Sequence, residues 1–115
     1  MSRVELRIES IIVGAARRWV LYAVPCAGED EVERVECHGL GELDGLLTKL
    51  RRTGVSDSVL LKAREVVLER SVPYGLGTHE LSQEDRDLLG LEPVAGVTRN
   101  DLDDFPLQQG GEESQ

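Results

Sequence analysis

Two histidines and two cysteines are the side chains of this sequence that best suit metal binding or nucleophilic chemistry. Cys37 and His38 are adjacent, and because adjacent side chains on a strand point to opposite faces, the two cannot hold one ion. A zinc site takes about four ligands, and the others would have to come from His79 and from acids in unrelated segments. We therefore expect no metal site, and we interpret Cys26 and Cys37 as small buried side chains rather than as a disulfide.

Short catalytic motifs are incomplete in this chain. His79-Glu80 begins like the motif of zinc proteases, but Gln83 stands where the second histidine is required. Gly75-Leu76-Gly77-Thr78 could offer backbone N–H groups to an anion, yet it lacks the third glycine and the lysine of a phosphate-binding loop. A nucleophile also needs a positioned base beside it, and no local pattern supplies one. The sequence thus predicts no catalytic residue and no cofactor, and it favours a protein that is not an enzyme.

The formal net charge of −9 at pH 7 is distributed unevenly along the chain. Residues 71–115 alone hold ten acidic and two basic side chains, a balance of −8. A nucleic-acid backbone is bound by a basic surface, so this composition argues against direct nucleic-acid binding. It also permits an alternative function, that of an acidic inhibitor or a nucleic-acid mimic that occupies a basic site on another protein.

The compartment is predicted from the apolar runs, the first residues and the cysteines. The apolar runs are far shorter than the ~20 residues that span a bilayer. The first residues alternate in charge, unlike a signal peptide. Two cysteines in 115 residues fit a reducing compartment. We expect a cytoplasmic protein that does not bind a membrane.

Three segments near the N-terminus have the alternation and the β-branched content of strands, namely 3–13, 17–26 and 32–38. Short breaks that contain glycine separate them, which predicts an antiparallel β-meander. If Gly14-Ala15-Ala16 forms a three-residue hairpin loop, Ile8 lies opposite Tyr22, and Tyr22 lies near Val35. A shift of one residue in this register would turn every side chain of a strand to the other face.

The expected register creates an apolar patch on the second face of the meander. Its members are Ile11, Val13, Trp19, Leu21 and, beside Trp19, His38. A tryptophan in an exposed apolar cluster is typical of a protein interface, so we predict these as protein-interaction residues. The alternative is that residues 91–97 fold over the patch within the same molecule.

Two helices are predicted after the meander. The first covers about 40–52 and carries a stripe of leucines, and the second covers about 56–70, with Ser56 as its N-cap. The second helix is apolar over roughly 220° of its circumference, which is more than packing on a sheet requires. This excess favours a homodimer or a protein partner.

A third, short helix is predicted near residue 85. Ser82, with Asp85 three residues later, resembles a capping box, and Gly90 is a suitable C-terminal residue. Residues 71–78 are expected to form a loop because of their proline and glycine content.

From Thr98 onward the sequence holds little that can be buried, so 98–115 is predicted as a disordered acidic tail after a single domain of residues 1–97. Apolar residues stand among its acids, and Leu102, Phe105 and Leu107 could form a short docking motif for a protein partner. The alternative is a tail that only improves solubility.

The predicted fold is α+β, a three-stranded antiparallel β-meander followed by two or three helices packed on one face. The favoured function is a small cytoplasmic interaction, adaptor or regulatory protein that binds a protein partner, itself as a homodimer, or both. The alternatives are the acidic inhibitor and a small enzyme whose site is assembled across a dimer from His38, His79 and carboxylates.

Overall fold

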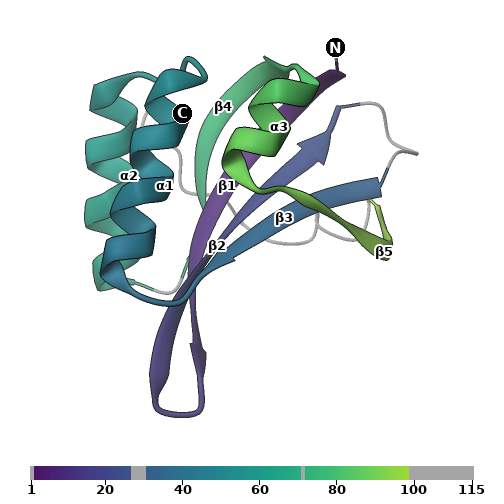
Figure 1. Ribbon diagram of the computed structural model, residues 1–115. Helices are drawn as coiled ribbons and strands as arrows, with labels where there is room; N and C mark the ends of the chain where they lie inside the picture. Colours follow the sequence, from purple (N-terminus) through teal and green to yellow (C-terminus); the bar gives the residue numbers. More distant parts are fainter. Residues whose placement is uncertain (1, 27–30, 71, 99–115) are drawn as a thin grey trace, which may run out of the picture.

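Three helices lie on one side of a five-stranded antiparallel sheet in the computed structural model of the chain (Figure 1). The structure describes residues 2–26, 31–70 and 72–98. The strands follow the spatial order β4-β1-β2-β3-β5. The elements in chain order are β1 (Ser2–Val13), β2 (Ala16–Pro25), β3 (Glu31–Cys37), α1 (Leu40–Arg52), α2 (Asp57–Glu69), β4 (Tyr74–Leu81), α3 (Gln83–Leu89) and β5 (Glu92–Thr98).

The α+β class predicted from the sequence is confirmed, and the predicted meander β1-β2-β3 forms the middle of the larger sheet. We call the side of the sheet that the helices cover the first face, and the opposite side the second face.

The outer strand β4 lies where a loop was expected for 71–78. Its backbone pairs with the free edge of β1, and the ladder shifts by a bulge between Leu6 and Arg7. Gly77 has a φ of +96°, a left-handed conformation that glycine adopts without strain. The glycines therefore serve an irregular strand rather than a loop, because pairing with β1 overrides the local signal.

The other outer strand, β5, pairs with β3. Glu92 lies opposite Arg34, and Pro93 lies opposite Glu33. β5 thus extends the sheet at its edge, and the alternative that residues 91–97 fold over the predicted patch on the second face is wrong.

The side chains of the central strand β2 point to the opposite faces of the sheet from those predicted. Leu21 pairs with Ile8 on one side and with Val35 on the other, at the position expected for Tyr22. The hairpin loop has two residues rather than three, because Val13 pairs with Ala16. Its first residue, Gly14, has a φ of +64°, as glycine has at the first central position of a type II′ turn.

The helices agree with the sequence in position and in their caps. Ser56 accepts a hydrogen bond from the backbone N–H of Val59 at the start of α2. Ser82 and Asp85 form a reciprocal capping box at the start of α3, and Gly90 ends that helix with a left-handed φ of +78°. None of the described helices is long and apolar enough to cross a lipid bilayer.

The hydrophobic core lies between the first face and the helices. Its strand members alternate along β1 and β2, as a sheet with one helix-covered face requires. The buried side chains of these two strands in the core are Val4, Leu6, Ile8, Trp19, Leu21 and Ala23. The wide apolar arc of α2 is only partly covered, since Leu61 stays 67% exposed.

Candidate functional site

The hairpin between β1 and β2 projects beyond the rest of the sheet, as Figure 1 shows. β4 pairs with β1 only as far as Ile8, and β3 pairs with β2 only from Trp19 onward. Residues 9–18 therefore form a two-stranded ribbon, which we call the projecting hairpin. A free ribbon of this kind is stable only when its base is well anchored.

The tip of the projecting hairpin is apolar and exposed. Ile12 is 60% exposed and Val13 is 45% exposed, while Ile11 is half-buried. No charged residue occurs from Ser10 to Ala16, in a chain with a net charge of −9. An exposed apolar tip contributes nothing to the core of its own domain, so its presence requires another explanation.

The base of the projecting hairpin is fixed to the C-terminal end of α2. Trp19 donates a hydrogen bond from its indole Nε1 to the backbone carbonyl of Val67 at 3.2 Å. Arg17 donates from its guanidinium to the carbonyl of Leu68 at 2.6 Å. The last turn of α2 has no basic residue of its own, and its final carbonyls have no partner within the helix. β2 therefore supplies both the hydrogen bonds and the positive charge that this helix end favours.

A partly buried ion pair adds a second anchor on the other side of the hairpin. The guanidinium of Arg18 lies 3.3 Å from the carboxylate of Glu36 on β3. This pair lies on the second face, whereas the bonds to α2 lie on the first face. The base is thus held on both faces while the tip is left free.

The structure separates the residues of the predicted apolar patch. Ile11 and Val13 lie on the projecting hairpin, but Trp19 and Leu21 are buried in the core. The expected four-residue patch on the second face is therefore not formed, because the two-residue loop turns β2 over. His38 follows the end of β3, is exposed, and donates its backbone N–H to the carboxylate of Glu42.

The predicted docking motif in the acidic tail lies outside the described residues. This applies to Leu102, Phe105 and Leu107. In contrast, Ile12, the more exposed of the two large apolar side chains at the hairpin tip, was missed by the sequence analysis. The signal that could have found it is Gly14 at the first position of a two-residue loop, since this loop assigns Ile12 to the tip of a ribbon.

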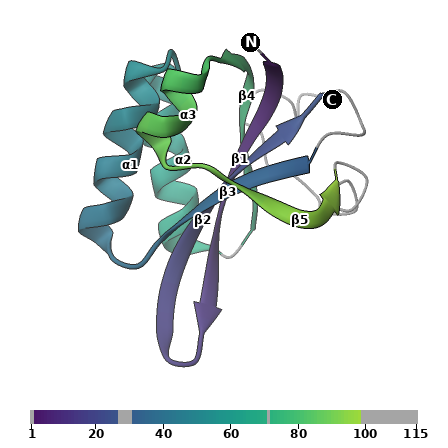
Figure 2. The same cartoon turned by 45° about the vertical axis from the view of Figure 1, so that its right-hand side comes forward.

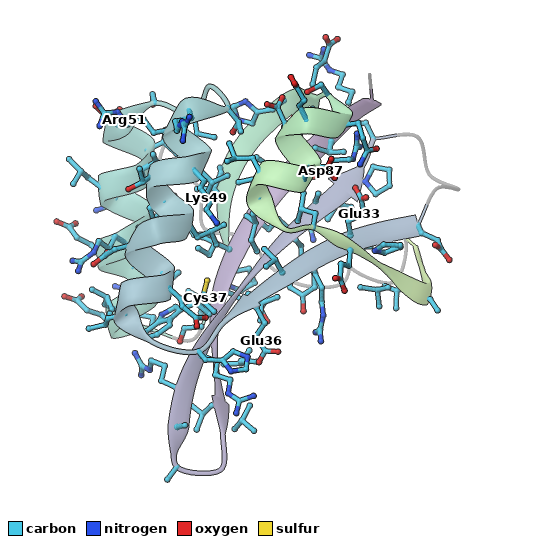
Figure 3. The ribbon with its side chains drawn as sticks, viewed as in Figure 1. Glu33, Glu36, Cys37, Lys49, Arg51 and Asp87 are labelled. Carbon is cyan, nitrogen blue, oxygen red and sulfur yellow. The ribbon has the colours of Figure 1, made fainter. Side chains whose placement is uncertain are left out.

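The reactive side chains do not form a cluster. Cys26 is exposed and Cys37 is buried, and both are free thiols. Cys37 lies between the sheet and α1 (Figure 3), where burial, and secondarily Glu42, raises the pKa of its thiol to about 11 despite the nearby Lys49. Across residues 2–26, 31–70 and 72–98, no three His, Cys, Asp or Glu side chains come together in a way that could hold a metal ion.

The imidazole of His79 is engaged with its own strand. Its Nε2 lies 3.0 Å from the backbone carbonyl oxygen of Leu76. This contact makes His79 part of the irregular path of β4 rather than of a group of catalytic side chains.

Two shallow clefts flank β5. One lies beside Arg34 and Glu36 on β3, and the other lies beside Glu33 and Arg86. In the second cleft the guanidinium of Arg86 is already bonded to the carboxylate of Glu33 at 2.8 Å. These charges join α3 to the sheet, which is a structural role.

In comparisons with known proteins, no family model matches this chain, no curated protein matches its sequence, and no solved structure matches its fold. The functional conclusion therefore depends on the projecting hairpin and its surroundings.

Proposed function

We propose that this chain is a small non-enzymatic interaction or adaptor protein, and that the tip of its projecting hairpin binds an apolar cleft on a protein partner. The observation that carries the proposal is the exposure of Ile12 and Val13 at the end of a ribbon whose base is bonded to α2. The tip is apolar and uncharged, so the cleft that fits it is apolar as well.

The energetics support a small anchor of this kind. Full burial of an isoleucine or valine side chain contributes about 1.5–3 kcal/mol, and roughly half of each side chain at the tip is still available for burial. Because the hairpin is held in place before binding, little conformational entropy is lost on association. A few buried apolar residues often supply most of the binding energy of an interface.

The test is capture of partners from a native lysate, with the full chain, the double variant Ile12→Ser/Val13→Ser and the control Leu61→Ser as baits. Leu61 is equally apolar and exposed but lies on α2, far along the chain from the hairpin. We expect a defined protein to be captured by the wild type and by the control and lost with the hairpin variant. Capture of the same proteins by all three baits, or of none by the wild type, would contradict the proposal.

Self-association is the second arm of the same test. Sedimentation velocity of the wild type and the Ile12→Ser/Val13→Ser variant shows whether the partner is another copy of the chain. A dimer that dissociates on substitution of the tip assigns the hairpin to a homodimer. The acidic inhibitor, the enzyme assembled across a dimer and the cytoplasmic compartment stay predictions from the sequence.

A further inference from the structure

The outer edge of β1 is open along the projecting hairpin. Among the described residues, β4 pairs with β1 only as far as Ile8, so residues 9–13 of β1 pair with β2 alone. Figures 1 and 2 agree that no other labelled strand runs beside the hairpin where it leaves the sheet. An open edge is a template for a further strand, because its outward backbone groups can pair with another chain.

The backbone groups that point outward follow from the register. Val13 and Ala16 flank the two-residue loop, and residues at these positions exchange both of their hydrogen bonds. Bonding alternates along an antiparallel ladder, so Ile11 also bonds to β2, whereas the N–H and C=O of Ile12 point away from it. Ile12 therefore presents a backbone donor and acceptor to the open edge, together with a side chain that is largely exposed.

The two outer strands of the sheet, in contrast, carry features that hinder such pairing. β4 has a left-handed φ of +96° at Gly77 and the exposed charge of Glu80. β5 contains Pro93 and has a left-handed φ of +76° at Gly96. Irregular backbone, prolines and charges are the usual protection of a strand edge. Residues 10–16 hold neither a proline nor a charged residue, so the hairpin lacks this protection.

The apolar residues of the hairpin lie on both of its faces. Ile12 continues the first face and pairs across the hairpin with Arg17, whereas Ile11 and Val13 alternate onto the second face. A ribbon that binds through one face alone needs apolar residues only at alternate positions. Three successive apolar residues fit an edge that is extended by another strand, because that strand supplies neighbours on both faces.

We propose that a second copy of the chain pairs with this edge, with β1 antiparallel to β1 and Ile12 opposite Ile12. In this two-fold arrangement the two Ile12 residues exchange backbone hydrogen bonds, and Ile11 of each copy lies opposite Val13 of the other. The register ends short of Ile8, where Tyr74 already occupies the edge. The inference rests on the proposed function, because it takes the same hairpin as the binding element and names its partner.

The charges of the hairpin permit this pairing between two acidic molecules. No charged residue lies in 10–16, so like charges do not face each other across the joined strands, and Glu9 lies beyond them. Arg17 and Arg18 lie on the outer strands of the pair, each bonded within its own copy. The outer strands are three spacings apart, ~14 Å, which exceeds the screening length of ~8 Å at physiological ionic strength.

The first experiment is an isotope-filtered NOE measurement on a mixture of labelled and unlabelled full chain. Ile11 of one copy and Val13 of the other form the closer, non-hydrogen-bonded kind of pair. We expect an NOE between their Hα atoms that arises only between copies and weakens on dilution. Intermolecular NOEs confined to another surface would overturn the inference. So would sedimentation velocity that shows a monomer at every concentration of the NMR series.

The second experiment compares two substitutions of Ile12 by sedimentation velocity. Ile12→Val keeps the N–H and an apolar side chain, so it should leave the dissociation constant of the dimer nearly unchanged. Ile12→Pro also keeps the side chain apolar, but it removes both hydrogen bonds of the two-fold pair, while the ladder with β2 keeps its bonds. We expect a dissociation constant at least about tenfold higher for Ile12→Pro. Equal constants for the two variants would contradict edge pairing, and the NOE measurement on the wild type decides the matter if Ile12→Pro does not fold.

Failure of this inference can be told apart from failure of the proposed function. If the chain is monomeric but captures a protein from the lysate that is lost with Ile12→Ser/Val13→Ser, edge pairing between copies is wrong and the function of the tip stands. If a dimer forms through another surface and lysate capture does not depend on the tip, both are wrong.

Discussion

The indole Nε1 of Trp19 and the backbone carbonyl of Val67 are hydrogen-bonded at 3.2 Å, which joins the first half of β2 to the last turn of α2. The sequence suggested an exposed tryptophan that anchors a partner. The structure instead uses its N–H to satisfy a carbonyl that the helix itself leaves open. Arg17 does the same for Leu68, so the start of β2 serves as a cap for α2.

Trp19→Phe is expected to destabilise the fold by about 1–3 kcal/mol. Phenylalanine keeps an aromatic ring but lacks the pyrrole part of the indole, so the carbonyl of Val67 loses its donor while it stays buried, and some packing is lost as well. Urea unfolding, followed by circular dichroism, measures the change. Arg18→Gln is the control, because Arg18 is a neighbouring residue of β2 whose partly exposed ion pair with Glu36 contributes less than about 1 kcal/mol. A cost for Trp19→Phe no larger than that of the control would show that the bond to α2 is unimportant.

The ion pair between Glu33 and Arg86 is expected to show a coupling energy of about 2 kcal/mol in a double-mutant cycle. Its side chains are only 22% and 14% exposed, and it connects β3 to α3 at 2.8 Å. The comparison is the pair Arg51–Asp57, whose side chains are 66% and 64% exposed and whose coupling should be about 0.5 kcal/mol. The cycles use Glu33→Gln with Arg86→Met and Asp57→Asn with Arg51→Met. Similar coupling energies for the two pairs would show that burial does not strengthen the first.

The two cysteines are expected to react at very different rates with a thiol reagent at pH 8. Cys26 is exposed, whereas Cys37 is buried and its thiol has a pKa of about 11. Three units below its pKa, only about one thiol in a thousand is ionised, and the thiolate is the reactive form. Ellman's reagent should therefore find one fast thiol in the native chain and two in denaturant. In Cys26→Ser the fast thiol should disappear, and two fast thiols in the native wild type would refute the burial of Cys37.

The helices could be predicted from the sequence because their signals are local. Ser56, Ser82, Asp85 and Gly90 each act within one turn of the helix that they begin or end. The faces of β1 and β3 were also predicted, since alternation within a single strand is a local pattern.

The face of β2 could not be predicted, because it depends on one residue of loop length. Both parities of β2 are apolar, so Trp19 and Val20 fit a buried position equally well. Only the choice between Gly14-Ala15 and a three-residue loop decides which of them meets the helices. Because the face of β2 differs from the prediction, the candidate site is the hairpin tip at Ile12 rather than a patch around Trp19.

The outer strands could not be predicted because they depend on long-range pairing. The glycines of β4 and the proline of β5 are local signals of a loop, and only contact with β1 and β3 makes these segments strands. The tail beyond Thr98 lies outside the described residues, so its predicted docking motif stays a prediction.

Glu9→Gln is expected to stabilise the protein at neutral pH. Burial raises the pKa of Glu9 in the folded state above its ordinary value of 4.5, although the charge of Arg7 opposes the shift. A carboxyl with a raised folded pKa contributes stability that is fully present below the unfolded pKa and is lost as the pH rises through the folded pKa. The charged form is therefore a cost at pH 7, which glutamine removes. Urea unfolding should show a higher free energy for the variant at pH 7 and a smaller difference below about pH 4.5.

The matched control for this pH dependence is Glu80→Gln. Its side chain is 55% exposed at the edge strand β4, so the substitution should change the free energy of unfolding little. If Glu9→Gln instead destabilises the protein at pH 7, the attraction between Glu9 and Arg7 exceeds the cost of burying the carboxylate.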